Sequence, residues 1–185
     1  MGIFALRVKK PFGEWLVLGI FNADEKAPAE KVISLERLGL DASKTYVAFD
    51  FWKQKFFGEL RGEFAVRLEP ASVVLLAIHE RRGVPQLIST DRHITQGGVE
   101  LESVQWDSAT IALRGVALSP SGTEHNVYLY LPRKHPWVQT DPFLFYDFPG
   151  YTLKIMEENI LRVRVRFDKA ERVPWEVNMS KFFGR

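Results

Sequence analysis

Cysteine is absent from this 185-residue sequence. Disulfide bonds, zinc–thiolate sites and thiol catalysis are therefore excluded, because each requires a cysteine sulfur. The absence also fits a chain that stays in the cytosol, where disulfides are rare.

A strong excess of one charge is missing as well. Lys and Arg number 25 against 23 Asp and Glu, which leaves a net charge of +2. This balance predicts no strong attraction to nucleic acid or to an anionic membrane. No apolar run is long enough to span a bilayer, and the first ten residues place their charges after the apolar residues, unlike a signal peptide. We therefore expect a cytoplasmic protein with no nucleic-acid partner and no membrane partner.

Helical periodicity is scarce, whereas short apolar or alternating runs are frequent. The only helical candidate is the segment 29–38, and within it Val32–Leu35 favours a strand. Aromatic residues, at 13%, also favour β-structure. Strands are predicted at Ile3–Val8, Glu14–Phe21, Val32–Leu35, Thr45–Phe51, Lys55–Leu60, Phe64–Leu68, Val73–Ile78, Gln86–Ser89, Val99–Val104, Thr110–Leu118, Asn126–Leu131, Tyr151–Met156, Ile160–Phe167 and Trp175–Met179.

This pattern predicts an all-β protein built as an antiparallel β-sandwich. Roughly fourteen strands are too many for one small sandwich, so we expect two packed β-sandwich modules. The Gly97-Gly98 step is a turn signal between two such runs, because glycine reaches positive φ without steric cost. The expected modules are therefore residues 1–97 and residues 98–185.

The segment Leu87–Leu101 joins the two halves and concentrates polar residues: Asp91, Arg92, His93 and Gln96. One hypothesis is a catalytic or metal-binding cluster around His93. Asp-x-His alone is a weak signal for such a site, because metal ligands come as spatial sets that no local spacing proves. The alternative, which we favour, is a structural polar centre in which a buried histidine and amide bond backbone groups at a strand crossing.

Several segments of the first half share residues with one known family. They are Phe21-Asn22, Leu38–Leu40, Val47–Trp52, Gly58, Leu68–Pro70 and Pro85–Gly97, of which His93-x-x-Gln96-Gly97 is the most specific. About the first half of the chain thus resembles the C-terminal β-sandwich of melibiase-type glycoside hydrolases, the α-galactosidase clan. The second half, with Trp106-Asp107 and Leu113–Gly115, resembles the further β-module that some of these enzymes carry.

The resemblance implies an accessory domain without catalysis, since the acid and the nucleophile of those enzymes lie on a separate barrel. Such a (β/α)₈ barrel needs on the order of 250 residues and alternating helices, which this sequence lacks. Glycoside hydrolysis requires a facing pair of carboxylates, and nothing in the sequence singles out a pair. The available acidic residues are Asp50, Glu59, Glu63, Asp91 and Asp107.

The loop Pro132–Gly150 is the best candidate for binding, because long loops rich in aromatic residues are usually functional. Its rings could stack on sugar faces or pack against a partner domain, and we favour capping or an interface. The candidate platform consists of Trp137, Phe143, Phe145, Tyr146 and Phe148. For two further features we expect a structural role only. Trp52 is expected to be a packing residue, and Arg162, Arg164 and Arg166 are expected to form one solvated strand face.

These observations predict a non-catalytic accessory protein without a metal or cofactor. Its expected partners are a glycosidase barrel, which it would dock on or stabilise, or a second copy of itself. The alternatives are a stand-alone carbohydrate-binding module that uses the aromatic loop and, third, a small glycosidase.

Overall fold

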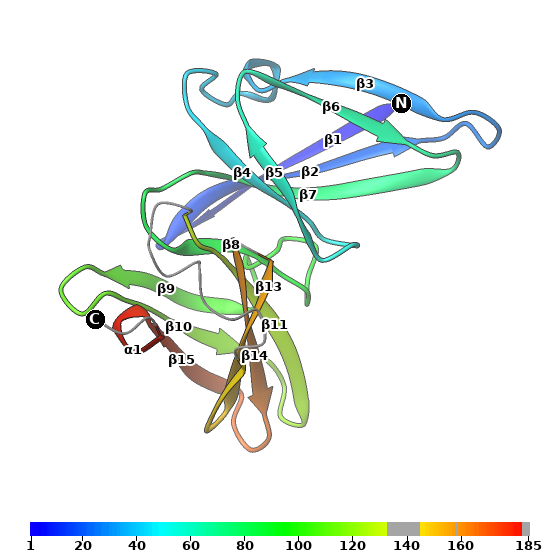
Figure 1. The fold of residues 1–185 in the computed structure, drawn as a ribbon. Coiled ribbons are helices and arrows are strands. Elements are labelled where there is room, and N and C mark those ends of the chain that lie inside the picture. The colour runs from blue at the N-terminus through cyan, green and yellow to red at the C-terminus, as the bar shows by residue number, and fades with distance from the viewer. Residues whose placement is uncertain (133–144, 158, 183–185) are drawn as a thin grey trace. The chain divides into compact units, whose positions relative to one another are not determined.

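The computed structural model describes residues 1–132, 145–157 and 159–182 (Figure 1). These residues form β-strands joined mostly by short turns, with one 3₁₀ helix, η1 (Glu36–Leu38), and one four-residue helix, α1 (Met179–Phe182). The strand pairs are antiparallel. The predicted all-β, antiparallel fold is confirmed.

The chain forms two compact units. The first comprises Met1–Lys9 and Glu14–Arg81, and the second comprises Lys10–Gly13 and Arg82–Arg185. The second unit thus begins before Gly97, where the sequence analysis places the boundary between modules. The reason is β8 (Gln86–Thr90), which precedes Gly97 but hydrogen-bonds to β11 (Thr123–Tyr130) of the second unit.

The first unit contains a five-stranded sheet, ordered β1-β2-β7-β4-β5, and a two-stranded sheet, β3-β6. Apolar side chains from both sheets form one buried cluster, as in a β-sandwich. The strands are β1 (Gly2–Lys10), β2 (Gly13–Asn22), β3 (Ala29–Ser34), β4 (Tyr46–Asp50), β5 (Lys55–Leu60), β6 (Glu63–Leu68) and β7 (Ser72–Glu80).

The alternation of side chains along β6 explains how this core forms. Phe64, Val66 and Leu68 are buried, whereas Glu63 and Arg67 are exposed. Successive side chains of a strand point to opposite faces, so this pattern presents one apolar face to the opposite sheet. Burial of each such side chain contributes about 1.5–3 kcal/mol relative to exposure.

The second unit contains a five-stranded sheet, ordered β12-β13-β14-β11-β8, and a three-stranded sheet, β15-β10-β9. Its remaining strands are β9 (Leu101–Asp107), β10 (Ala112–Leu118), β12 (Phe145–Phe148), β13 (Tyr151–Glu157), β14 (Ile160–Phe167) and β15 (Arg172–Asn178).

Strand β14 has the two faces that its sequence predicts. Leu161, Val163, Val165 and Phe167 are buried, with at most 6% of each exposed. On the other face Arg164 donates to Glu124 at 2.9 Å, and Arg166 donates to Asp147 at 3.0 Å. Two arginines of this face, Arg164 and Arg166, are therefore paired with acidic side chains.

Candidate functional site

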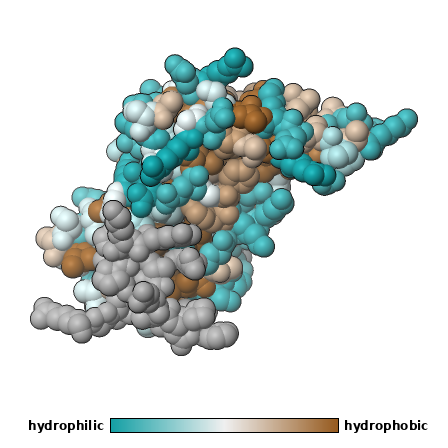
Figure 2. Space-filling view, turned by 45° about the horizontal axis from the view of Figure 1, so that its top comes forward, coloured by the Kyte–Doolittle hydropathy of each residue, from teal (hydrophilic) through white to brown (hydrophobic). Residues whose placement is uncertain are grey.

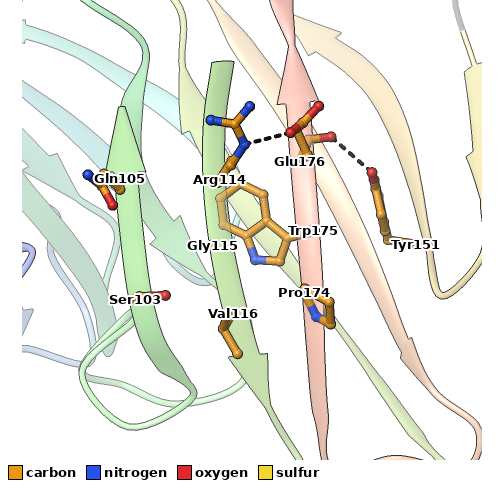
Figure 3. Close-up of a pocket in the computed structure, with 9 residues that line it drawn as sticks. All are labelled: Ser103, Gln105, Arg114, Gly115, Val116, Tyr151, Pro174, Trp175 and Glu176. Atoms are coloured by element: carbon orange, nitrogen blue, oxygen red, sulfur yellow. Dashed lines mark hydrogen bonds and ion pairs between the residues drawn. The ribbon is translucent and has the colours of Figure 1, made fainter. Parts of the chain in front are cut away.

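A pocket of about 440 Å³ opens in the second unit beside the sheet β15-β10-β9 (Figure 3). One lining residue comes from the other sheet, Tyr151 at the start of β13. The lining residues are Ser103, Gln105, Arg114, Gly115, Val116, Tyr151, Pro174, Trp175 and Glu176. Strand pairing brings them together, since β10 pairs with both β9 and β15.

The floor of this pocket depends on a glycine. Gly115 lies opposite Trp175 in the strand register. A Cβ added to Gly115 would stand 2.2 Å from Cζ2 of the indole and 2.9 Å from the carbonyl oxygen of Ser103. Figure 3 accordingly shows the indole lying across β10 at this position. Only glycine leaves room for this close approach inside a strand.

Trp175 is 2% exposed, and its indole Nε1 forms no hydrogen bond with any residue that the structure describes. A buried N–H without an acceptor costs on the order of 1–3 kcal/mol. The Nε1 atom is itself buried, so this donor is not exposed to a group that enters the pocket.

A charged row borders the pocket. Arg114 donates from Nε to Glu176 at 2.6 Å and from Nη1 to Asp107 at 2.9 Å. The hydrogen bond from the Thr110 hydroxyl, followed by that from Arg114, lowers the pKa of Asp107 to about 2. A general acid of a glycosidase needs a raised pKa, so Asp107 does not fit that role.

Tyr151 supplies the aromatic wall. Its hydroxyl donates to the backbone oxygen of Glu176 at 3.1 Å, and its ring stacks on Phe148 with centroids 5.0 Å apart. Burial raises the pKa of the Tyr151 phenol. The phenol therefore stays neutral at neutral pH and keeps its proton for hydrogen bonding.

The pocket thus combines two aromatic rings, a hydroxyl, an amide and a charge pair that is balanced within itself. These groups suit a neutral, hydroxyl-rich ligand, which is held by aromatic surface and by a few hydrogen bonds. Sequence analysis did not identify this pocket. The one local signal was Gly115, a glycine inside an otherwise apolar strand, which marks close approach of another group.

The predicted polar centre is divided between two places by the structure. Asp91 accepts hydrogen bonds from the backbone N–H of Asn126 at 2.7 Å and from its side-chain Nδ2 at 2.5 Å. Gln96 is fully buried and accepts from Ser89 at 2.8 Å. Asp91 thus links its segment to Asn126 of β11, whereas Gln96 bonds within its own segment.

The expected burial does not hold for His93, because His93 and Arg92 are exposed. His93 bonds locally, to the hydroxyl and the backbone N–H of Thr95. His125 of the same unit is buried, with 3% exposed. Desolvation lowers the pKa of His125, and neither of its ring nitrogens has a hydrogen-bond partner in the described part of the chain.

Glu100, which sequence analysis missed, organises the turn after β8. Glu100 is 2% exposed, and its carboxylate accepts from the Thr90 hydroxyl, from Gly97 N at 3.0 Å and from Val99 N at 3.2 Å. Within the described ranges, no three His, Cys, Asp or Glu side chains gather as potential metal ligands.

The predicted aromatic platform is described only in part. Trp137 and Phe143 lie outside the described residues, as does the side chain of Phe145. Tyr146 and Phe148 lie on β12, and Phe148 stacks on Tyr151, which lines the pocket. In the first unit, Trp52 is 59% exposed and packs edge-on against Phe51.

Comparison with known proteins agrees with the resemblance seen in the first half of the sequence. Residues 11–78 match the family model of the alpha galactosidase C-terminal beta sandwich domain. This match ends before His93-x-x-Gln96-Gly97, so the resemblance of that segment and of the second half stays a prediction. No curated protein matches the chain.

Among solved structures, the chain is similar to α-galactosidase I from Mortierella vinacea. The identity is 20% and the TM-score 0.32, over 40% of this chain and 22% of that one. The chain thus corresponds to less than a quarter of the length of that enzyme. No helix in the described ranges is both long and apolar enough to cross a membrane.

Proposed function

We propose that this chain is a non-catalytic accessory protein that docks on the catalytic barrel of an α-galactosidase-type glycoside hydrolase and stabilises it. The match of residues 11–78 to the alpha galactosidase C-terminal beta sandwich domain carries this proposal. The low pKa of Asp107, which the hydrogen bonds from Thr110 and Arg114 cause, removes this one residue as a candidate general acid.

A direct test uses an α-galactosidase barrel encoded in the same genome as this chain and expressed without any β-sandwich domain. Binding only to the folded barrel stabilises that barrel by mass action. We expect the two proteins to co-elute in gel filtration, and the half-life of the barrel's activity on heating to lengthen when the chain is added. Separate elution together with an unchanged half-life would refute docking.

The non-catalytic assignment has its own test. The purified chain alone should release no chromophore from aryl α- or β-glycosides. If hydrolysis is observed and survives replacement of Asp107 and Glu176 by their amides, the activity belongs to carboxylates elsewhere. Any hydrolysis retained through purification would contradict the assignment.

A second function, saccharide binding, is supported by the pocket beside Tyr151. The ring of Tyr151 offers aromatic surface, and Ser103 and Gln105 offer polar groups that a sugar hydroxyl can bond. Titration calorimetry with galactose and galacto-oligosaccharides tests it. Binding should weaken in Tyr151→Ala, which removes a lining ring, and remain in Trp52→Phe, whose ring lies in the first unit. Flat titrations across the panel would remove this function.

A further inference from the structure

Among the described residues, strand β1 ends the five-stranded sheet of the first unit and pairs with β2 alone (Figure 1). It carries apolar side chains at the surface: Phe4 is 67% exposed, and Ile3 and Leu6 are each 38% exposed. Soluble proteins usually protect such an edge with lysine, proline, a bulge or a covering segment. The lysines of this strand, Lys9 and Lys10, lie at its turn end, and the stretch from Gly2 to Leu6 has neither lysine nor proline.

The neighbouring strands extend the exposed apolar surface. On β2 Phe21 is 46% exposed, and on β7 its register partner Val73 is 52% exposed. The ring of Phe21 lies over Gly2, and Phe4 lies beside Gly19. The same face of the sheet is therefore apolar from the edge inward. The space-filling view shows brown, apolar side chains at the surface among hydrophilic ones (Figure 2).

The hairpin determines which backbone groups of β1 are open. A two-residue turn, Pro11-Phe12, joins β1 to β2. The residues flanking such a turn form a hydrogen-bonded pair, and the pairs alternate along the hairpin. The backbone N–H and C=O groups of Ile3, Ala5 and Arg7 therefore point away from β2 and are available to another strand.

We propose that β1 pairs with β1 of a second copy of this chain, antiparallel across a two-fold axis, with Ala5 opposite Ala5. In this register Ile3 lies opposite Arg7 of the second copy. These are the residues whose backbone groups point outward, so each facing pair can exchange two hydrogen bonds. Centring the axis on Arg7 instead would place two guanidinium groups opposite each other, which is destabilising.

The side chains fit the same register. Phe4 lies opposite Leu6 of the second copy, in a non-hydrogen-bonded pair where side chains approach most closely. Arg7 does not need a new partner, because it already donates to Glu14 at 2.8 Å and to the carbonyl of Gly39 at 3.0 Å. Between Gly2 and Val8 the pairing thus covers apolar surface without placing like charges opposite each other.

Disulfide trapping tests the register, since the chain has no cysteine of its own. In the proposed dimer, a Phe4→Cys chain mixed with a Leu6→Cys chain places two thiols directly opposite, within the range of about 4.4–6.8 Å between Cα atoms that a disulfide requires. We expect rapid formation of the mixed dimer under mild oxidation. The matched control mixes Phe4→Cys with Ile3→Cys, whose side chain lies on the other face of the strand.

Proline at Ala5 tests the backbone pairing. The backbone N–H of Ala5 points away from β2. Ala5→Pro therefore removes hydrogen bonds to the second copy and leaves the hairpin paired. Light scattering should report twice the mass of one chain for the parent and the mass of one chain for Ala5→Pro. Phe4→Lys should also be monomeric, whereas Val73→Lys, two strands in from the edge, should remain dimeric.

Either of two results would overturn the proposal. One is a parent chain that stays monomeric throughout a concentration series. The other is a matched control pair that cross-links as fast as Phe4→Cys with Leu6→Cys. A dimer that persists in both Ala5→Pro and Phe4→Lys, with unchanged circular dichroism, would assign self-association to another surface and would likewise contradict it.

Discussion

Gly115 and Trp175 lie opposite each other on β10 and β15, and the indole occupies the space that a Cβ at position 115 would need. This relationship shapes the pocket of the second unit, because the ring rests directly on the backbone of its neighbour. It also leads to the first prediction.

Gly115→Ala should destabilise the protein by about 1–3 kcal/mol, the usual cost of overpacking a well-filled interior. The added methyl would stand 2.2 Å from the indole, so the ring or the strand must move. Urea denaturation measures the change. Gly83→Ala is the control, because a Cβ there meets nothing within 4 Å. Trp175→Leu should restore part of the loss in a double-mutant cycle, and purely additive effects would refute the steric explanation.

Glu100→Ala should lower the free energy of unfolding by about 2–4 kcal/mol, because it leaves buried donors without an acceptor. These donors are the Thr90 hydroxyl and the backbone N–H of Gly97. Glu102→Ala, which removes an exposed ion pair with Arg172, is the control and should stay close to the parent protein. Equal effects of the two substitutions would show that the turn does not depend on Glu100.

His125 should make stability depend on pH. Desolvation lowers its pKa below the ordinary 6.5, an effect that outweighs the nearby charges of Glu100 and Asp91. The unfolded chain therefore binds the proton more readily than the folded one. The contribution of neutral His125 to the free energy of unfolding is fully present above pH 6.5. It is lost as the pH falls from 6.5 through the folded-state pKa of His125.

Denaturation at a series of pH values measures this dependence. His125→Leu should flatten the slope of unfolding free energy below pH 6.5. Phe167→Leu keeps the histidine but removes the ring that packs against it at 5.1 Å. It should therefore lower stability at every pH and retain a slope. If the slope persists unchanged in His125→Leu, the titrating group is another residue.

Asn22→Asp should destabilise the first unit at neutral pH by about 1–3 kcal/mol. The Asn22 side chain is buried, and its Nδ2 donates to the carbonyls of Ala27 at 2.9 Å and Glu69 at 3.1 Å. A carboxylate there would face two acceptors instead of donating to them. Stability should recover partly at acidic pH, where the new carboxyl group is protonated. Asp24→Asn, at an exposed position, is the comparison.

Local pattern predicted the strands well and the sites poorly. The alternation of Leu161, Val163 and Val165 with arginines identified both faces of β14, because side-chain direction in a strand depends only on position along it. The segment 29–38 became β3 followed by η1, as the β-branched run favoured. By contrast, no local pattern shows that Asp91 bonds Asn126, 35 residues later.

The sequence by itself therefore determined that this protein is an antiparallel, helix-poor β-protein, and it carried the resemblance that residues 11–78 bear out. Only the tertiary structure decided that His125 rather than His93 is buried, and that Arg114, Tyr151 and Trp175 share one pocket. The physical reason is that burial and cross-strand neighbours depend on which strands pair. That pairing is chosen by the packing of whole sheets, which no short run of residues encodes.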